Sequence, residues 1–160
     1  MNISDIDKIR GCDSQGCGYF GASRSGGTRK HNGADIPCDV GDKVPSIVAG
    51  EVTKLGYPYS SDLTKRYVEI TASIQDLSGG EYKYRFQHFY VDPLVEVGDQ
   101  VRLNQPIGKL QHLDSMEKGG THHSHIQIRN ENGDYVDPTP ILLVLKSLSG
   151  SVADAAKSIS

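Results

Sequence analysis

The sequence lacks a long apolar run, an excess of positive charge and a hydrophobic stretch at its start. Without about 18 consecutive apolar residues, no segment is expected to span a membrane. Lys and Arg total 17 against 20 Asp and Glu, so the net charge of −3 indicates no nucleic-acid partner. Residues 1–10, MNISDIDKIR, lack the basic start and apolar centre of a cleavable secretory signal. The protein therefore stays inside the cell, leaves by a route that needs no such signal, or has lost a leader.

The chain also lacks internal repeats and low-complexity linkers, which indicates a single domain. A chain of 160 residues can bury about 70% of its unfolded surface in one core. Gly occurs 18 times and Tyr 8 times, while Leu-rich helical periodicity is scarce. This composition favours strands and turns over helices. We expect an N-terminal extension over residues 1–30, a core over 31–140 and a tail over 141–160.

Cysteine is scarce, with three residues. Cys12 and Cys17 flank a turn-like stretch and could close a small disulfide loop. As half of a metal site they would need two more soft ligands, and Cys38 supplies at most one. We favour the disulfide, and with it an oxidising place of action. Cys38 is then a free thiol or a residue without its partner.

Two segments about ninety residues apart carry the candidate chemistry, His31-Asn32-Gly33-Ala34-Asp35 and His123-Ser124-His125. In an extended chain, side chains two or four residues apart share one face, so each polar pair can point into one pocket. Two imidazoles and a carboxylate form the ligand set of a catalytic zinc with an open position, which leaves one histidine to move protons. Each short motif alone occurs by chance, and a lone histidine is more often a surface or core residue. Their combination predicts a zinc hydrolase.

Alternating patterns predict a small antiparallel β fold with loops around a cleft. Residues 67–71 and 82–86 are expected to be neighbouring strands joined through a Gly-rich turn. On the strand at 123–129, the two histidines, Gln127 and Arg129 would share the cleft face, with isoleucines packed behind. Arg129 and Tyr59 are equally candidates for the groove and for ordinary surface. Weak helical character at 152–159 predicts a short C-terminal helix packed on the sheet or, less favoured, a partner-binding or delivery segment.

These motifs resemble the lysostaphin/LytM-type zinc metallopeptidases. The resemblance runs from His31 to Pro138 and covers H-x-G-x-D, H-x-H, the segments 41–52 and 97–108, and the closing Tyr135-Val136-Asp137-Pro138. It implies that His31, Asp35 and His125 hold one zinc ion and that the fold is a small, mainly β peptidase. His122 offers another register for H-x-H, but strand alternation favours His123 with His125.

The resemblance also assigns the remaining histidines. His88, in Tyr84-Arg85-Phe86-Gln87-His88, stands at the place of the family's fourth histidine, so that His88 and His123 would be the catalytic, non-ligating pair. His123 would move the proton of the attacking water to the leaving amine. His88 would donate a hydrogen bond to the developing oxyanion, a contribution of roughly 3–4 kcal/mol. Gln127, His122 and Ser124 depart from the family's usual Glu, Pro and Leu without removing any of these groups.

The N-terminal stretch from Cys12 to Gly18 is similar to that of the leukocyte cell-derived chemotaxins, secreted vertebrate members of the same fold. That likeness implies a Cys12–Cys17 disulfide and a free Cys38. The chemotaxins keep the zinc ligands but lack a catalytic histidine. His88 is therefore the feature that favours an enzyme over a non-catalytic, zinc-stabilised binding or signalling module.

The resemblance implies an endopeptidase that cuts stem or cross-bridge peptides of bacterial peptidoglycan. A two-metal phosphoesterase is disfavoured because the extra carboxylates are absent. With no cleaved signal visible, the protein could be an antibacterial effector delivered by a contact-dependent secretion machine, or a phage or endolysin module. An effector would act in the periplasm or outside the cell and would have a cognate inhibitor, or immunity, protein.

Overall fold

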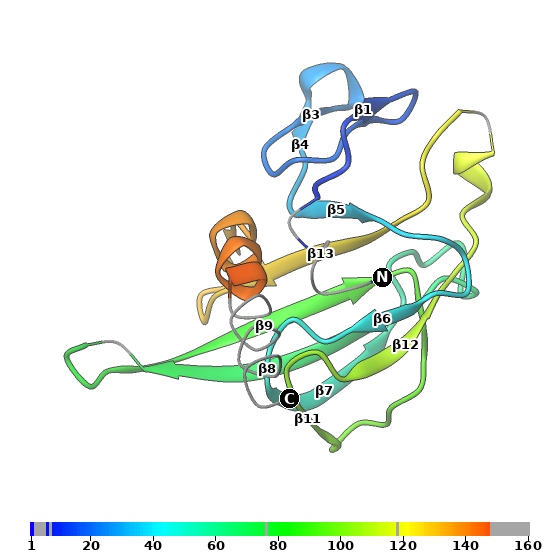
Figure 1. Ribbon diagram of the computed structural model, residues 1–160. Helices are drawn as coiled ribbons and strands as arrows, with labels where there is room; N and C mark the ends of the chain where they lie inside the picture. The colour runs from blue at the N-terminus through cyan, green and yellow to red at the C-terminus, as the bar shows by residue number, and fades with distance from the viewer. Residues whose placement is uncertain (2–5, 7, 76, 118, 148–160) are drawn as a thin grey trace, which may run out of the picture.

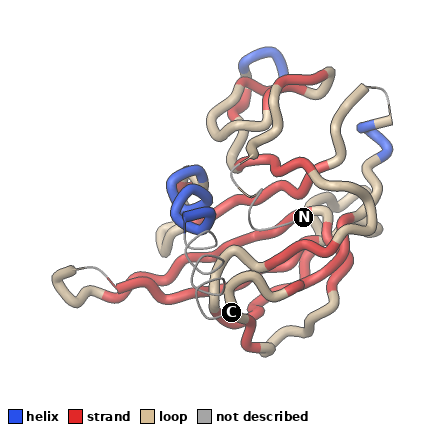
Figure 2. Tube along the Cα trace, viewed as in Figure 1, coloured by secondary structure: helices blue, strands red, loops and turns tan. Residues whose placement is uncertain are grey.

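The computed structural model describes residues 1, 6, 8–75, 77–117 and 119–147, and the fold is mainly β (Figures 1 and 2). The strands of its large sheet are β5 (Ala34–Pro37), β7 (Gly50–Gly56), β8 (Tyr67–Gln75), β9 (Glu81–Phe89), β11 (Gln100–Val101), β13 (His123–Arg129) and β14 (Tyr135–Val136). This seven-stranded sheet has the order β11-β7-β8-β9-β13-β14, and β5 pairs with β13. Every pairing is antiparallel, which confirms the predicted fold class.

The β8–β9 hairpin forms the centre of the large sheet, as the alternating patterns predict. The two strands pair without a break from Tyr67 opposite Phe89 to Gln75 opposite Glu81. Gly79, in the connecting turn, has a φ of +86°, in the left-handed region that glycine adopts without steric cost. The long, uninterrupted register fixes which side chains of β9 face each side of the sheet.

A three-stranded sheet covers part of the core face of the large sheet. It consists of β6 (Lys43–Pro45), β10 (Val91–Pro93) and β12 (Pro106–Leu110), in the order β10-β12-β6. Buried side chains from both sheets form one hydrophobic cluster: Val44, Val52, Val68, Ile70, Val91, Val95, Val101, Ile107 and Leu110. Burying each such side chain stabilises the fold by about 1.5–3 kcal/mol, which holds the two sheets together.

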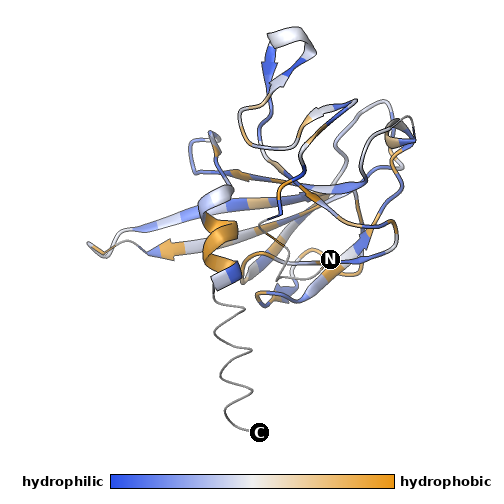
Figure 3. Cartoon of the chain, turned by 45° about the horizontal axis from the view of Figure 1, so that its top comes forward, coloured by the Kyte–Doolittle hydropathy of each residue, from blue (hydrophilic) through white to orange (hydrophobic). Residues whose placement is uncertain are grey.

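The C-terminal part of the described chain is helical over residues 139–147 and packs on the core face near β13. Leu142 and Leu145 are buried in a second hydrophobic cluster with Phe86, Ile126 and Ile128 of the large sheet. Figure 3 shows the hydrophobic residues of this helix in orange. The helix predicted over 152–159 lies outside the described residues. No helix within the described ranges is both long and apolar enough to cross a membrane.

Two small hairpins precede β5 in the chain and lie above it in the view of Figure 1. They consist of β1 (Cys12–Asp13) with β2 (Gly16–Cys17), and β3 (Ser23–Arg24) with β4 (Arg29–Lys30), the latter pair joined by the 3-10 turn Ser25–Gly27. A second 3-10 turn, Asp114–Met116, lies in the loop before β13. Backbone hydrogen bonds from Arg10 to Asp35 and from Asp35 to Gly18 attach this N-terminal part to β5.

Candidate metal centre

Pairing of β5 with β13 brings the two predicted motifs together. His125 stands opposite Asp35 in the register, and His31 lies just before β5. His31 Nε2 lies 3.1 Å from Asp35 Oδ1 and 3.0 Å from His125 Nδ1, and His125 Nδ1 lies 2.9 Å from Asp35 Oδ1. Two imidazole nitrogens and one carboxylate oxygen thus converge on one point. This is a donor set that zinc binds while keeping a position open.

In both His31 and His125, the ring nitrogen that faces away from the centre makes a hydrogen bond. His31 Nδ1 lies 2.9 Å from the Tyr19 carbonyl oxygen, and His125 Nε2 lies 3.1 Å from Gln127 Oε1. Both partners are acceptors, so the proton of each neutral ring sits on the nitrogen that faces away from the centre. The lone pairs of His31 Nε2 and His125 Nδ1 are therefore directed into the site. The residues present fit a zinc ion on this ground.

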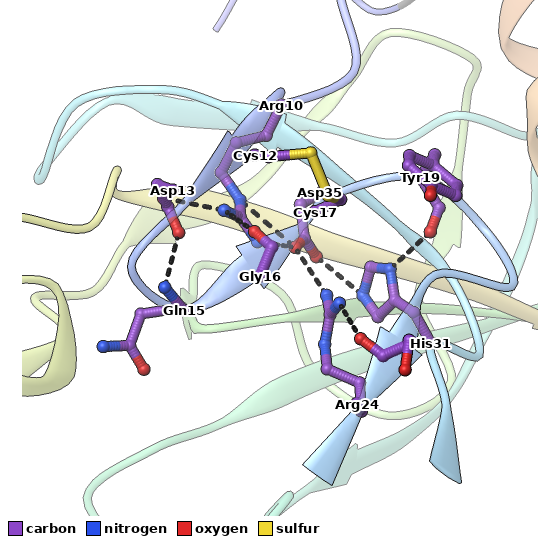
Figure 4. Close-up of a disulfide and its surroundings, with 11 residues drawn as sticks. Arg10, Cys12, Asp13, Gln15, Gly16, Cys17, Tyr19, Arg24, His31 and Asp35 are labelled. Atoms are coloured by element: carbon purple, nitrogen blue, oxygen red, sulfur yellow. Dashed lines mark hydrogen bonds and ion pairs between the residues drawn. A yellow bond between two sulfur atoms is a disulfide. The ribbon is translucent and has the colours of Figure 1, made fainter. Parts of the chain in front are cut away.

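The two carboxylate oxygens of Asp35 face different partners, the candidate metal centre and a buried arginine (Figure 4). Its Oδ1 faces the histidines, while Oδ2 accepts hydrogen bonds from Arg10 Nη2 at 2.8 Å and Nε at 3.3 Å. Arg24 Nη2 lies 3.8 Å from the same oxygen. Burial raises the pKa of Asp35, but the His125 and His31 hydrogen bonds and the charge of His123 outweigh it, so the pKa is well below its ordinary value. The carboxylate is ionised and oriented toward the centre.

His123 lies at the edge of the same centre without joining the ligand set. Its Nδ1 is 2.7 Å from the Thr121 carbonyl oxygen, and its Nε2 is 3.6 Å from Asp35 Oδ2. Burial lowers the pKa of His123, although the charge of Asp35 opposes that effect. A neutral imidazole with Nε2 exposed to the site has the geometry of a proton acceptor.

His88 does not reach the centre, and its predicted contact with the oxyanion is wrong. It stands opposite Ile126 and Val68 in the register, on the core face of the sheet. The side chain is fully buried, and its Nε2 accepts a hydrogen bond from the Ile47 amide at 3.3 Å. The neighbouring Phe89 occupies the cleft face instead, with its ring centroid 5.1 Å from that of His125.

The wrong prediction for His88 arises because side chains alternate between the two faces of a strand. A shift of one residue in the assignment of β9 exchanges its two faces. Phe86 and His88 share a face, and Phe86 is almost completely buried in the hydrophobic core. The apolar Phe86 two residues before His88 was the sequence signal that could have placed His88 in the core, because the two side chains share one face of the strand.

The buried His88 is expected to make the fold sensitive to acid. Burial lowers its pKa to about 4 from 6.5, because the imidazolium cannot be hydrated in the core. The unfolded chain then binds the proton more readily, so His88 leaves stability intact above pH 6.5 and costs about 3 kcal/mol as the pH falls to 4. His88→Gln can keep an acceptor near Ile47 without titrating, and it should flatten this dependence.

Urea unfolding of the metal-free protein at several pH values between 7 and 4 measures the effect. The exposed His112 provides the matched control, His112→Gln, which should retain the wild-type pH dependence. Equal pH dependence in wild type and His88→Gln would contradict the burial of a neutral His88.

Comparison with known proteins identifies the fold around this centre. The family model for Peptidase family M23 matches residues 29–138, which include both predicted metal-binding motifs. The chain belongs to peptidase family M23. The predicted resemblance to lysostaphin/LytM-type peptidases is thereby confirmed. Family M23 is typically zinc-dependent, in agreement with the donor set found here.

Individual M23-like proteins give the same result. Leukocyte cell-derived chemotaxin-2 of Mus musculus is 31% identical over 136 residues, 85% of this chain and 80% of that protein. The protein of the same name from Bos taurus is 30% identical with the same coverage. The catalytic domain of the antimicrobial peptidase lysostaphin from Staphylococcus simulans superposes with a TM-score of 0.56 at 21% identity, covering 88% of this chain and 97% of that domain. The lysostaphin likeness is evidence for the fold alone.

A chain of buried polar side chains supports the candidate ligand His125 from behind. Glu69 Oε2 accepts from Gln87 Nε2 at 2.7 Å, and Gln87 Oε1 accepts from Gln127 Nε2 at 2.6 Å. Because Glu69 Oε2 accepts from Gln87, it orients both amides, and Gln127 Oε1 is left to accept from His125. Such partners fix the tautomer and ring orientation of a metal-binding histidine. Sequence reasoning noted Gln127 but missed Glu69 and Gln87.

Tyr90 is a further cleft residue that sequence reasoning missed. Its φ of +64° is in the left-handed region, which is strained for a residue with a side chain. The ring lies 5.8 Å from that of His123, edge-on, and the hydroxyl is 2.7 Å from the hydroxyl of Tyr59. Burial raises the pKa of Tyr90, so the phenol keeps its proton. No local pattern in the sequence indicates Tyr90, since nothing nearby in the chain requires a positive φ there.

The cysteines behave as the sequence and the chemotaxin likeness suggest. Cys12 and Cys17 form a disulfide across the β1–β2 hairpin, next to the Arg10–Asp35 pair (Figure 4). Arg10 Nη1 donates to the Gly16 carbonyl within this hairpin at 2.8 Å. Cys38 is a free thiol, and burial raises its pKa to about 11, which makes it unreactive. The disulfide loop therefore helps to hold Arg10 against Asp35.

Proposed function

We propose that this M23 protein is a zinc-binding module that holds a peptide of the bacterial cell wall in its cleft without hydrolysing it efficiently. One observation carries the proposal. The histidine that would stabilise the oxyanion, His88, lies in the core, and Phe89 takes the adjacent position on the cleft face. Loss of one such donor lowers the rate of hydrolysis by about 100- to 1,000-fold.

The metal-binding part of the site is intact and well supported. His31, Asp35 and His125 are held by partners outside the centre, and the cleft above them has a volume of about 730 Å³. When bound, zinc supplies a Lewis acid that attracts a carbonyl or carboxylate oxygen of a ligand. This chain's own residues position the donors and enclose the cleft. A ligand-binding role needs no more than this.

Hydrolysis is the second candidate, favoured by His123 and Tyr90. His123 presents Nε2 to the site as a proton acceptor, and Tyr90 carries a protonated hydroxyl in the same cleft. Tyr90 could donate the hydrogen bond that His88 cannot. Under this candidate the protein would be a zinc endopeptidase of peptidoglycan peptides, consistent with its family. An antibacterial effector with a cognate inhibitor protein belongs to this candidate as well.

The disulfide supports a place of action outside the reducing cytoplasm. Disulfides persist in the periplasm and outside the cell, where peptidoglycan is accessible. We therefore include a periplasmic or extracellular site of action in the proposal. The route by which the chain gets there is independent of the cleft and its chemistry.

The test separates binding from cleavage in one sample. Zinc-loaded protein is mixed with purified, insoluble peptidoglycan; sedimentation reports binding, and mass spectrometry of the supernatant and of digested wall reports new peptide ends. We expect one zinc per chain, co-sedimentation that a chelator abolishes, and no new ends. His123→Ala should still co-sediment, and the exposed His112→Ala should behave as wild type.

Two outcomes would count against the proposal. New peptide ends that vanish in His123→Ala and decrease in Tyr90→Phe would establish the endopeptidase. Absence of both binding and cleavage by the zinc-loaded protein would show that the cell wall is not the ligand.

A further inference from the structure

We infer that the cleft takes an acidic peptide, one with free carboxylates on both sides of the segment that lies at the metal centre. This inference rests on the proposed function and names its ligand class.

The charge of the cleft is opposite to that of the protein. Among the described residues that line it, five are basic and Asp35 is the single carboxylate, although the chain as a whole has a net charge of −3; the five are Arg10, Arg24, Arg29, Lys30 and Arg129. Arg10 is neutralised within the protein, by Asp35 and by Asp13 at 2.7 Å. The other four leave a positive field in a concave site, which concentrates anionic ligands.

Arg129 supplies a fixed cation on the floor of the cleft. It lies four residues after His125 on the same face of β13, about 13 Å along the strand. Its guanidinium is stacked on the Tyr135 ring, 4.4 Å from the centroid, and donates to the Tyr135 hydroxyl. Arg129 lines the cleft, so a ligand carboxylate could accept hydrogen bonds from its guanidinium there.

A second arginine makes the same position more favourable for an anion. Arg85 on β9 stands directly opposite Arg129 in the register, and like charges in directly opposed positions repel. No described carboxylate lies within ion-pair distance of either residue. Glu69 lies on the same face two residues along β8, and its carboxylate is already hydrogen-bonded to Gln87 and Thr53. A ligand carboxylate would relieve this repulsion.

The β3–β4 hairpin supplies the basic groups on the other side of the centre. Arg29 and Lys30 are exposed, and the single partner of the Arg29 guanidinium among the described residues is the Ser25 hydroxyl. Arg24 Nη2 lies 3.8 Å from Asp35 Oδ2, but this oxygen already accepts a hydrogen bond from Arg10 at 2.8 Å. The metal centre is thus flanked by cations on the hairpin and on the strand. This arrangement fits a peptide whose negative charges lie on both sides of the bound segment.

Isothermal titration calorimetry with a matched pair of ligands tests the inference. The probes are an N-acetylated tetrapeptide with carboxylates at both ends and the same peptide with every carboxylate converted to an amide. At low salt we expect the zinc-loaded protein to bind the acidic peptide at least about 10-fold more tightly. This preference should shrink in about 0.5 M salt, roughly three times the physiological ionic strength. Arg129→Gln and Lys30→Gln should each reduce the preference several-fold.

Arg102→Gln removes the same charge from an exposed position that does not line the cleft and should leave the preference unchanged. Equal affinity for both peptides would overturn the inference while leaving the proposed binding function in place. An equal loss of preference in Arg102→Gln and Arg129→Gln would overturn it too, because the effect would then come from overall charge. Binding of neither peptide by zinc-loaded protein would overturn both the inference and the proposed peptide binding.

Discussion

Asp35→Asn is expected to abolish zinc binding and to lower the free energy of unfolding of the metal-free protein by about 3 kcal/mol. The carboxylate is one of three candidate metal ligands and also the partner of Arg10, whose side chain is 4% exposed. Replacing it by an amide leaves a buried guanidinium without its main counter-charge. The loss should fall at the low end of the range for broken buried pairs, because Asp13 still contacts Arg10.

Guanidinium chloride unfolding in the presence of a chelator measures the stability effect, and competition with a fluorescent zinc chelator measures affinity. Asp39→Asn is the matched control, because Asp39 is exposed and lies outside the cleft. A stability loss no greater than that of Asp39→Asn would show that the Arg10–Asp35 pair does not hold the N-terminal hairpins on β5. Retained zinc affinity would show that the metal is bound elsewhere.

Gly33→Ala is expected to weaken zinc binding by about 100-fold and to destabilise the fold by about 1–3 kcal/mol. A Cβ at this position would overlap the Ile126 carbonyl oxygen and would lie 2.8 and 2.9 Å from two atoms of the His125 ring. Both neighbours belong to β13, which pairs with β5 directly after Gly33. The added methyl group must therefore push the His125 imidazole away from Asp35 or separate the two strands.

The comparison is made with Gly11→Ala, at which a Cβ would meet nothing within 4 Å. Zinc competition and chemical denaturation of both variants give the two effects separately. Gly33→Ala should lose zinc affinity, and Gly11→Ala should retain it. Equal zinc affinity in the two variants would mean that the close approach of Gly33 to His125 is unimportant for the centre.

The convergence of the three candidate ligands was predictable from the sequence because it depends largely on local geometry. Alternation along an extended chain places His123 and His125 on one face, and the structure has both on the cleft face of β13. The structure also brings His31 and Asp35 to His125, as the spacing of the two motifs indicated. Gly33 within the first motif has its reason in the close approach to β13.

The supporting residues could not be predicted, because each contact joins segments far apart in the chain. Arg10 reaches Asp35 across 25 positions, and Gln127 reaches Gln87 across 40. No periodicity in the sequence encodes such pairs. They become neighbours only when the N-terminal hairpins attach to β5 and when β9 pairs with β13.

The sequence by itself determined the class of the fold, the two metal-binding motifs and the family, since these depend on residue types and on short-range periodicity. Only the tertiary structure decided the position of His88, on which the proposed preference for binding over hydrolysis rests. A strand has two faces, and the pairing of β9 with β8 and β13 selects which of them meets the core. Burial of Phe86 fixes that choice, because exposing its ring would cost more than burying a neutral imidazole.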